Sequence, residues 1–289
     1  LHTEPVPGLP PLTSGLVGYL GWDVVRRWEN LPYPPADDVN LPEFALNMVS
    51  DMAIHDNTDG TVLLIANAIN FNGTDENVDD AYVDAVERLH RMLQQLEQGA
   101  SETASVLTGV SEVNDRIHRE VTQTWSVQGY QDAIDRCKKN IIDGDVFQIV
   151  ISRRFEVETG ADALDVYRVL RQSNPSPYMY LFNFEDAEGI PFQIVGSSPE
   201  ALVTLKEGRA TSHPIAGSRP RGATREQDIA LAEELLADQK ERSEHLMLVD
   251  LARNDLSRIA KPGTVSVDEF MVIERFSHIM HISSSVSAE

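Results

Sequence analysis

The sequence has few basic residues for its length. Its 289 residues include 24 Lys and Arg against 46 Asp and Glu, which gives a formal net charge of -22. Binding to nucleic acid rests largely on Lys and Arg that neutralise phosphates, and adsorption to an anionic membrane surface depends on the same residues. The charge balance therefore argues against both kinds of partner.

Cysteine and long apolar runs are also scarce. The single cysteine, Cys137, cannot form an internal disulfide, which favours a reducing, cytoplasmic setting. No stretch approaches the roughly 18 consecutive apolar residues of a membrane span, and no basic-then-apolar signal segment opens the chain. We therefore expect a cytoplasmic protein without a membrane anchor.

Nucleotide-binding motifs and internal repeats are missing as well. The sequence contains neither a G-x-G-x-x-G stretch nor a P-loop, and helices and strands alternate without a steady βαβ rhythm. Its hydrophobic fraction of 42% is ordinary for a globular protein that buries a sizeable core. The fold class that fits best is α+β.

The first half of the chain predicts a hairpin, a helix and a linker. Two strands, Phe44 to His55 and Thr61 to Ala68, flank a turn rich in Asp and Gly, which tolerate positive φ. Apolar residues between Ala81 and Leu96 recur at helical spacing. Gly99 to Asp115 is rich in Ser, Thr and Gly and predicts a linker. We therefore place an N-terminal subdomain at 1-115 and a second region at 116-289.

The second region predicts helices and a long strand. Ser126 is a candidate N-cap for a helix that ends at Gly144. Alternating apolar residues predict a strand from Val146 to Val157. Two further helices are expected at 226–237 and 239–251.

Two segments of the second region have side chains suited to anions or cations. His213 to Gly222 has two glycines, two prolines and the nearby Arg219 and Arg221, so it is either a carboxylate-binding loop or a surface turn with solvated arginines. Glu241 and Glu244 share one face of a helix, so they are either Mg²⁺ ligands or part of a solvated acidic turn.

Two other segments leave the same kind of choice open. His278 and His281 lack further Cys or His at zinc-ligand spacing, so a proton-transfer histidine or a structural one is expected. Asn174 to Met179 contains two prolines that hold a rigid turn, either the wall of a small-molecule pocket or an ordinary loop.

Taken together, these segments resemble the large subunit of anthranilate synthase, a member of the chorismate-utilising enzymes. The matching motifs appear in order along nearly the whole chain: Asn174 to Met179, Ser198-Pro199-Glu200, Pro214 to Gly222, Glu241 to His245, Leu248 to Asp255, and His278 to His281. The resemblance implies packed antiparallel sheets flanked by helices. It also implies a lyase that converts chorismate and ammonia to anthranilate and pyruvate for tryptophan biosynthesis.

The resemblance also implies roles for single residues. Glu244 matches a Mg²⁺ ligand, with Glu241 beside it in the metal site. Glu200 matches the general acid that protonates the departing hydroxyl, a role for which burial could raise its pKa. His281 matches an active-site histidine that assists the elimination. The segment that cradles the substrate corresponds to Ala216, Gly217 and Ser218, although threonine is commoner at the last position.

Two positions distinguish among the relatives. Gln148 stands where isochorismate- and salicylate-forming members have a lysine that activates water, and a neutral amide cannot deprotonate water. Ala216 stands where many aminodeoxychorismate synthases have a nucleophilic lysine, so that covalent route is closed. Both residues favour ammonia as the nucleophile.

The family's regulation and partner are implied in the same way. The segment Asn174, Pro175, Ser176, Pro177, Tyr178 and Met179 matches the part of the family that binds tryptophan as a feedback inhibitor. A glutamine amidotransferase subunit is expected to supply the ammonia. The family's Leu-Leu-Glu-Ser-like motif and its later glycine-, arginine- and glutamate-bearing motifs are not in this sequence, so we expect a chain that is incomplete at both ends and inactive alone.

Two other functions stay open at this point. One is the reaction of a lysine-independent aminodeoxychorismate synthase component I, which uses the same substrate. The other is a non-catalytic fragment that responds to tryptophan or binds a partner. The joint presence of Glu200, Glu244 and His281 weighs against the second.

Overall fold

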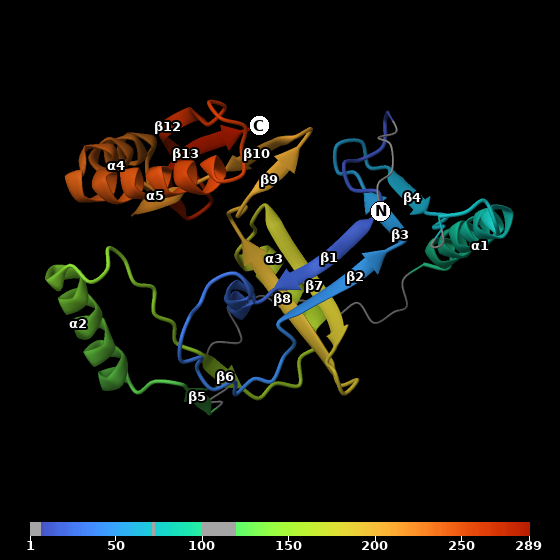
Figure 1. Ribbon diagram of the computed structural model, residues 1–289, viewed down its shortest axis with the longest axis horizontal. Helices are drawn as coiled ribbons and strands as arrows, with labels where there is room; N and C mark the ends of the chain where they lie inside the picture. Colours follow the sequence, from blue (N-terminus) through green and yellow to red (C-terminus); the bar gives the residue numbers. More distant parts are fainter. Residues whose placement is uncertain (1–6, 71–72, 100–119) are drawn as a thin grey trace. The chain divides into compact units, whose positions relative to one another are not determined.

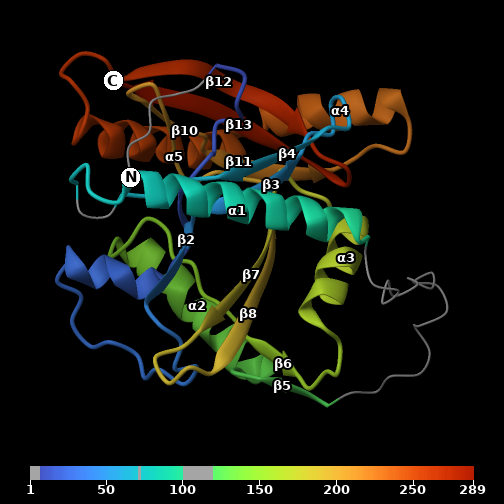
Figure 2. The same ribbon diagram turned by 90° about the vertical axis from the view of Figure 1, so that its right-hand side faces the viewer.

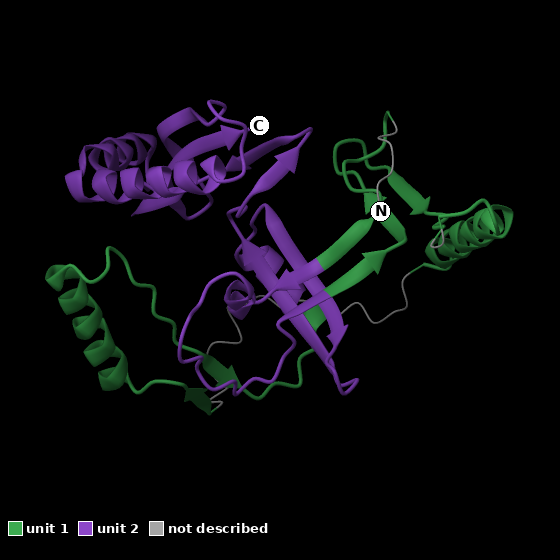
Figure 3. Ribbon diagram, in the orientation of Figure 1, with its two compact units in different colours: residues 1–17, 46–165 green, residues 18–45, 166–289 purple. Residues whose placement is uncertain are grey.

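The structure is a computed structural model that describes residues 7–70, 73–99 and 120–289. The chain divides into two compact units, coloured separately in Figure 3: residues 1–17 with 46–165, and residues 18–45 with 166–289. We call them the first and the second unit and describe each by itself. The expected boundary between 115 and 116 lies outside the described residues, as does nearly all of the expected linker, so the division into 1-115 and 116-289 stays a prediction.

Figure 1 labels the helices and strands in chain order. They are β1 (Gly15–Leu20), the 3-10 helix η1 (Trp22–Arg27), β2 (Phe44–Val49), β3 (Asp51–His55), β4 (Val62–Ala66), α1 (Val78–Glu97), β5 (Val121–Gln123), α2 (Val127–Asp143), β6 (Phe155–Val157), α3 (Ala163–Ser173), β7 (Tyr178–Glu185), β8 (Pro191–Ser198), β9 (Thr204–Lys206), β10 (Arg209–Ser212), β11 (Ile215–Pro220), α4 (Arg225–Ala237), α5 (Gln239–Ser257), β12 (Ser266–Arg275) and β13 (Ile279–Ala288). In the part of the chain that is described, no helix has the length and apolar character needed to cross a membrane.

The predicted hairpin of the first unit is confirmed, with one break. Its first strand is interrupted at Ser50, which divides it into β2 and β3, and β3 pairs antiparallel with β4. The turn closes through Asp56, whose carboxylate accepts from the N–H of Thr58 at 2.8 Å, while Gly60 takes φ +75°. The predicted helix is α1, which packs on β3 and β4 (Figure 2).

Helix α2 begins and ends where the sequence predicts. The Ser126 hydroxyl accepts from the N–H of Gly129 at 3.0 Å, and Gly144 ends the helix in the left-handed conformation at φ 83°. The strand predicted from Val146 to Val157 is wrong for most of its length, because only β6 forms. A strand needs a neighbour to satisfy its backbone, and the partner β5 is three residues long.

The hairpin β7–β8 of the second unit carries a row of aromatic rings. Tyr180, Phe182 and Phe184 alternate along β7 and so lie on one face, with successive ring centroids 5.1 and 5.5 Å apart. Tyr180 lies over Gly196, its partner on β8, where an added Cβ would be 2.2 Å from the ring. The glycine therefore leaves the room that this stacked row needs.

The second unit also contains a five-stranded antiparallel sheet. Strand β13 lies at its centre, with β12 along one side and β10 followed by β11 along the other, while β9 extends the sheet beyond β10. Strands β10 and β11 are nearly one strand interrupted at His213 and Pro214. The carbonyl of Pro214 accepts from the N–H of Ser284 at 3.1 Å, so the interruption stays joined to β13.

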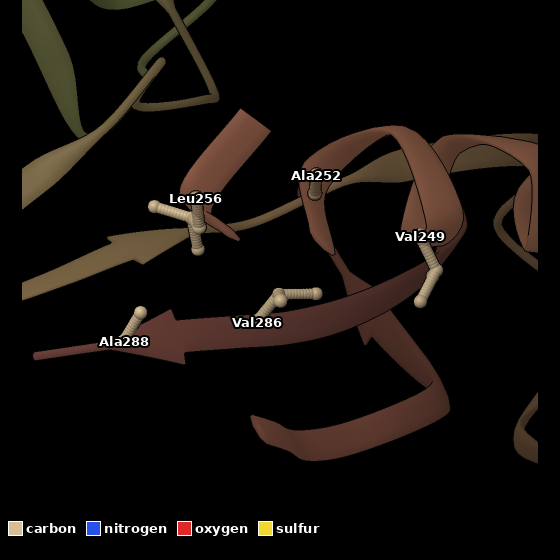
Figure 4. Close-up of a cluster of buried hydrophobic side chains, with 5 residues drawn as sticks. All are labelled: Val249, Ala252, Leu256, Val286 and Ala288. Carbon is tan, nitrogen blue, oxygen red and sulfur yellow. The ribbon is translucent and has the colours of Figure 1, made fainter. Parts of the chain in front are cut away.

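Helices α4 and α5 cover one face of this sheet, and the core lies between them and β13 (Figure 2). Val286 and Ala288 point from β13 toward Val249, Ala252 and Leu256 of α5 (Figure 4). A neighbouring cluster consists of Ala232, Leu235, Met280 and Ile282. Because successive strand residues face opposite sides, His281, Ser283, Ser285 and Ser287 face away from the helices. The expected α+β class with antiparallel sheets and flanking helices is confirmed.

Candidate functional site

The substrate-cradling segment predicted from the sequence is a bulged strand. We expected a loop at His213 to Gly222, but residues 215–220 form β11 and pair with β13. The pairing shifts between Ala216 and Ser218, and Gly217 lies in this bulge at φ 72°. The expectation of a loop is wrong for residues 215–220, because β13 satisfies the backbone groups of this segment.

Gly217 brings the bulge against helix α5. A Cβ added to this residue would lie 3.2 Å from Glu241 Oε2, 3.3 Å from Glu241 Cβ and 3.2 Å from Leu235 Cδ1. Both the positive φ and the lack of room favour glycine here. The structure thus joins two segments that the sequence suggested separately, the bulge and the acidic turn of α5.

His281 lies on the other side of the same bulge. Its Nδ1 is 2.9 Å from Ser218 Oγ and 3.2 Å from the carbonyl of Gly217. Ser218 is the residue of β11 that pairs with His281. A carbonyl can only accept, so the contact with Gly217 places the proton on Nδ1. Nε2 is then the ring nitrogen whose lone pair can accept a proton. Phe276 contacts the ring edge to face, with centroids 5.6 Å apart.

The two carboxylates of α5 meet at one cation. Lys240 Nζ is 3.1 Å from Glu241 Oε1 and 3.2 Å from Glu244 Oε2, so both carboxylates reach the same point, as their spacing predicts. The Lys240 side chain is otherwise exposed. Within residues 7–70, 73–99 and 120–289, no group of three or more His, Cys, Asp or Glu side chains is arranged to hold a metal ion.

Glu200 lines a pocket of about 190 Å³ in the second unit. The Ser198 side chain holds the backbone of Glu200 in place. Ser198 Oγ donates to the carbonyl of Glu200 at 3.0 Å and accepts from the N–H of Glu200 at 3.3 Å. Partial withdrawal from water raises the pKa of the Glu200 carboxyl, the charge of Glu274 raises it further, and a positive charge on His213 lowers it. The pocket lining is Pro177, Tyr178, Pro199, Glu200, Ala201, His213, Ile215, Glu274 and Phe276.

The segment predicted to bind tryptophan adjoins this pocket. Residues 174–177 precede β7, and the carbonyl of Asn174 accepts from Ser197 Oγ of β8 at 2.8 Å. Pro177 and Tyr178 line the pocket together with Glu200. The expected inhibitor segment and the expected acid are thus neighbours, which sequence spacing alone did not show.

Gln148 belongs to a different unit of the chain from the other candidate residues. It belongs to the first unit, between α2 and β6, whereas Glu200, Glu241, Glu244 and His281 belong to the second unit. Its place relative to them therefore stays a prediction.

Both arginines near the bulge form ion pairs with acidic residues. Arg219 donates to Glu234 Oε1 and Asp238 Oδ2, both at 3.1 Å. Arg221 donates to Asp228 at 2.7 and 3.3 Å and to the carbonyl of Phe276 at 2.7 Å.

Asp228 is the centre of this arginine network. It also accepts from Arg275 Nε at 2.9 Å and from the N–H of Gly222 at 3.0 Å. These partners hold the pKa of Asp228 well below its usual range, with the hydrogen bond from Arg221 as the largest cause. The arginines therefore fasten α4 to the sheet through ion pairs with its acidic residues.

Sequence reasoning missed part of the Glu200 pocket. The missed residues are Glu274 and Phe276, which come from β12 and the turn after it. His213 opens the candidate segment that ends at Gly222, and it lies at the interruption between β10 and β11. The pairing of Glu274 with His281 brings this acid to the site. A register of this kind depends on contacts distant in sequence, so no local signal could have identified Glu274.

The sequence was compared with protein families and with curated proteins, and both comparisons found relatives. Residues 2–289 match the family described as chorismate binding enzyme. Anthranilate synthase component 1 of Arthrobacter globiformis is 59% identical over 99% of this chain and 53% of its own length. The protein of the same name from Mycolicibacterium smegmatis is 55% identical over 100% of this chain and 54% of its own length.

A solved structure agrees with the sequence comparison. Anthranilate synthase component I from Streptococcus pneumoniae has a TM-score of 0.79 and 30% identity, over 100% of this chain and 60% of that one. The chain thus spans about half the length of the curated relatives it matches. With a family match over nearly its whole length, the chain belongs to the chorismate binding enzymes.

Proposed function

We propose that this chain is part of an anthranilate synthase component 1, which converts chorismate and ammonia to anthranilate, pyruvate and water. The observation that carries the proposal is 59% identity, over nearly the whole chain, to a protein of that name. The chain also keeps Glu200 at a pocket and His281 against the bulge, which gives it groups suited to both chemical steps.

The first step needs an acid, and Glu200 is the candidate. As ammonia forms a C–N bond to the chorismate ring, the ring hydroxyl leaves and takes the proton of the Glu200 carboxyl to become water. Glu200 then carries a negative charge. Its raised pKa supports this role, because a carboxyl that stays protonated closer to neutral pH can give up its proton at this moment.

The second step needs a base, and His281 is the candidate. The ring loses a proton to become aromatic while the C–O bond to the enolpyruvyl group breaks, and the departing group takes up a proton to become pyruvate. The contact of Nδ1 with the Gly217 carbonyl leaves Nε2 to accept the ring proton. Ser218 and Gly217 fix the orientation of the imidazole.

The choice of ammonia as nucleophile rests on two side chains. Gln148 cannot act as a general base toward water, and ammonia needs no such base. Ala216 has no group that could attack the substrate. We infer on these grounds that the chain aminates chorismate and does not hydrate it.

Mg²⁺ is part of the proposal, with Glu241 and Glu244 as its ligands. The residues fit the ion, since both carboxylates already reach one ammonium group and Mg²⁺ takes one or two carboxylates with waters and substrate oxygens. When bound, the ion would neutralise a carboxylate of the substrate. The exposed Lys240 side chain can swing away to make room.

Replacing Glu244 with glutamine is expected to weaken Mg²⁺ binding about tenfold, which corresponds to roughly 1.4 kcal/mol. Calorimetric titration of Mg²⁺ into the protein measures this directly, without an activity assay. Glu233→Gln, on the exposed side of α4, is the matched control. Equal Mg²⁺ affinity in the two variants would contradict the assignment.

Regulation and partners are proposed from the resemblance of the sequence motifs to the family. Asn174 to Met179 would contribute to a tryptophan site that inhibits the enzyme, and its place beside the Glu200 pocket supports this. A glutamine amidotransferase subunit would supply ammonia. A cytoplasmic location is proposed from the single cysteine, which is free and half-buried.

Product analysis tests the proposed function. The chain, expressed with any sequence that flanks it in its gene, is expected to form fluorescent anthranilate from chorismate, ammonia and Mg²⁺. Accumulation of aminodeoxychorismate without pyruvate would assign it to the aminodeoxychorismate synthases instead. Binding of tryptophan without turnover of chorismate would indicate a regulatory fragment.

A further inference from the structure

The Glu200 pocket contains a second carboxyl group from a different part of the fold. Glu200 follows β8, while Glu274 lies near the end of β12, and both line the same pocket of about 190 Å³. Glu274 pairs with His281 across the strands, so its position is fixed by the register of the central sheet. The two acids are 74 residues apart in the sequence, and only the fold brings them together.

Few charged groups share this space. The titratable residues that line the pocket are Tyr178 from β7, His213 from the junction of β10 and β11, Glu274 from β12, and Glu200 itself. Glu274 and His213 act on Glu200 in opposite directions, because a like charge disfavours the ionised carboxyl and a positive charge favours it. Partial withdrawal of the Glu200 carboxyl from water strengthens both effects.

We propose that Glu274 is a positioning residue of this site, a carboxylate that acts through Glu200 by keeping the proton on it until the leaving group takes it. The inference rests on the proposed function and extends it by one residue. Glu274 itself gives no proton to the substrate. Its negative charge makes the ionised form of Glu200 costly, so Glu200 stays a carboxylic acid over a wider pH range.

The charge also has a consequence for the completed step. Once Glu200 has given its proton to the departing hydroxyl, two carboxylates share the pocket, and their repulsion favours rapid uptake of a new proton by Glu200. A positive charge on His213 opposes this effect. Together with partial withdrawal from water, which is the largest cause of the raised pKa of Glu200, these two neighbours set the pH at which the acid is ready for the next turnover.

The direct test is a ¹³C NMR titration of the Glu200 carboxyl in this chain, with the signal assigned by its loss in Glu200→Gln. In Glu274→Gln we expect the midpoint to fall, and in His213→Gln we expect it to rise. Glu269→Gln, an exposed acid on the same strand outside the pocket, is expected to leave it unchanged. Glu274→Asp keeps the charge and should stay closer to the unsubstituted protein than Glu274→Gln does.

The two substitutions are expected to shift the titration midpoint of Glu200 in opposite directions. A general disturbance of the fold would move both variants the same way, so shifts of one sign in Glu274→Gln and His213→Gln would overturn the proposal, as would an unchanged midpoint in Glu274→Gln. The NMR titration needs no turnover, so failure of the proposed activity and failure of this inference are distinguishable. Where anthranilate is formed, kcat of Glu274→Gln should fall about threefold at the alkaline end of the pH profile and little at the acid end.

Discussion

Replacing Glu200 with glutamine is expected to lower kcat for anthranilate formation by about 10²- to 10⁴-fold, the usual contribution of a positioned general acid. Glutamine has nearly the same shape and can still fill its place in the pocket, but its amide cannot give a proton to the leaving hydroxyl. Binding of chorismate should change far less than turnover, because the proton is transferred only in the transition state.

Steady-state kinetics with anthranilate fluorescence measures the loss, and calorimetric titration measures chorismate binding. Glu188→Gln, in the exposed turn between β7 and β8, is the control and should retain its activity. A Glu200→Gln variant that turns over at the original rate would show that the proton comes from another group.

Truncating Leu235 to alanine is expected to lower the free energy of unfolding by about 2–5 kcal/mol. Its side chain is fully buried between α4 and the sheet, among Ala232, Met280 and Ile282. It also lies beside Gly217 at the bulge. The cavity left by three missing carbons would lie directly beneath the proposed site, so a loss of activity should accompany the loss of stability.

Urea unfolding of the protein, followed by circular dichroism, measures the difference in the free energy of unfolding. Leu205→Ala on β9 is the matched control, because that leucine is 75% exposed and its truncation should change the free energy of unfolding by less than about 0.5 kcal/mol. Equal destabilisation by the two substitutions would show that the cluster around Leu235 does not hold the helix to the sheet.

Features governed by neighbours in the sequence were predictable. The hydroxyl of Ser126 caps α2 and Gly144 ends it because both effects act within one helical turn. The hairpin β3–β4 follows from its turn residues in the same way. The Glu241 and Glu244 carboxylates converge because their spacing of three is a property of any α-helix.

Features governed by register were not predictable. The strand expected up to Val157 lacks a neighbour for most of its length: Phe147 and Val150 stay 91% and 88% exposed. The bulge at Gly217 is visible only once β13 is paired against β11. Glu274 reaches the site through that same central strand, so its role could not be inferred from spacing.

The arginines show a third kind of difference. Arg219 and Arg221 stand out in an acidic chain, and a carboxylate ligand was a reasonable expectation. In the structure they pair with acidic residues of α4, and Asp228 accepts hydrogen bonds from both Arg221 and Arg275. In a chain with excess negative charge, a basic residue can thus pair with acidic residues of the same chain, and its place in the sequence alone does not identify a ligand site.

At the bulge in β11, the single residue Gly217 separates two groups of the proposed site. On one side of Gly217 there is no room for a Cβ next to Glu241, a proposed cation ligand, and on the other side its carbonyl lies 3.2 Å from Nδ1 of His281, the proposed base. The proposed cation ligand Glu241 and the proposed base His281 thus lie on opposite sides of one residue, so a side chain introduced at position 217 would disturb both.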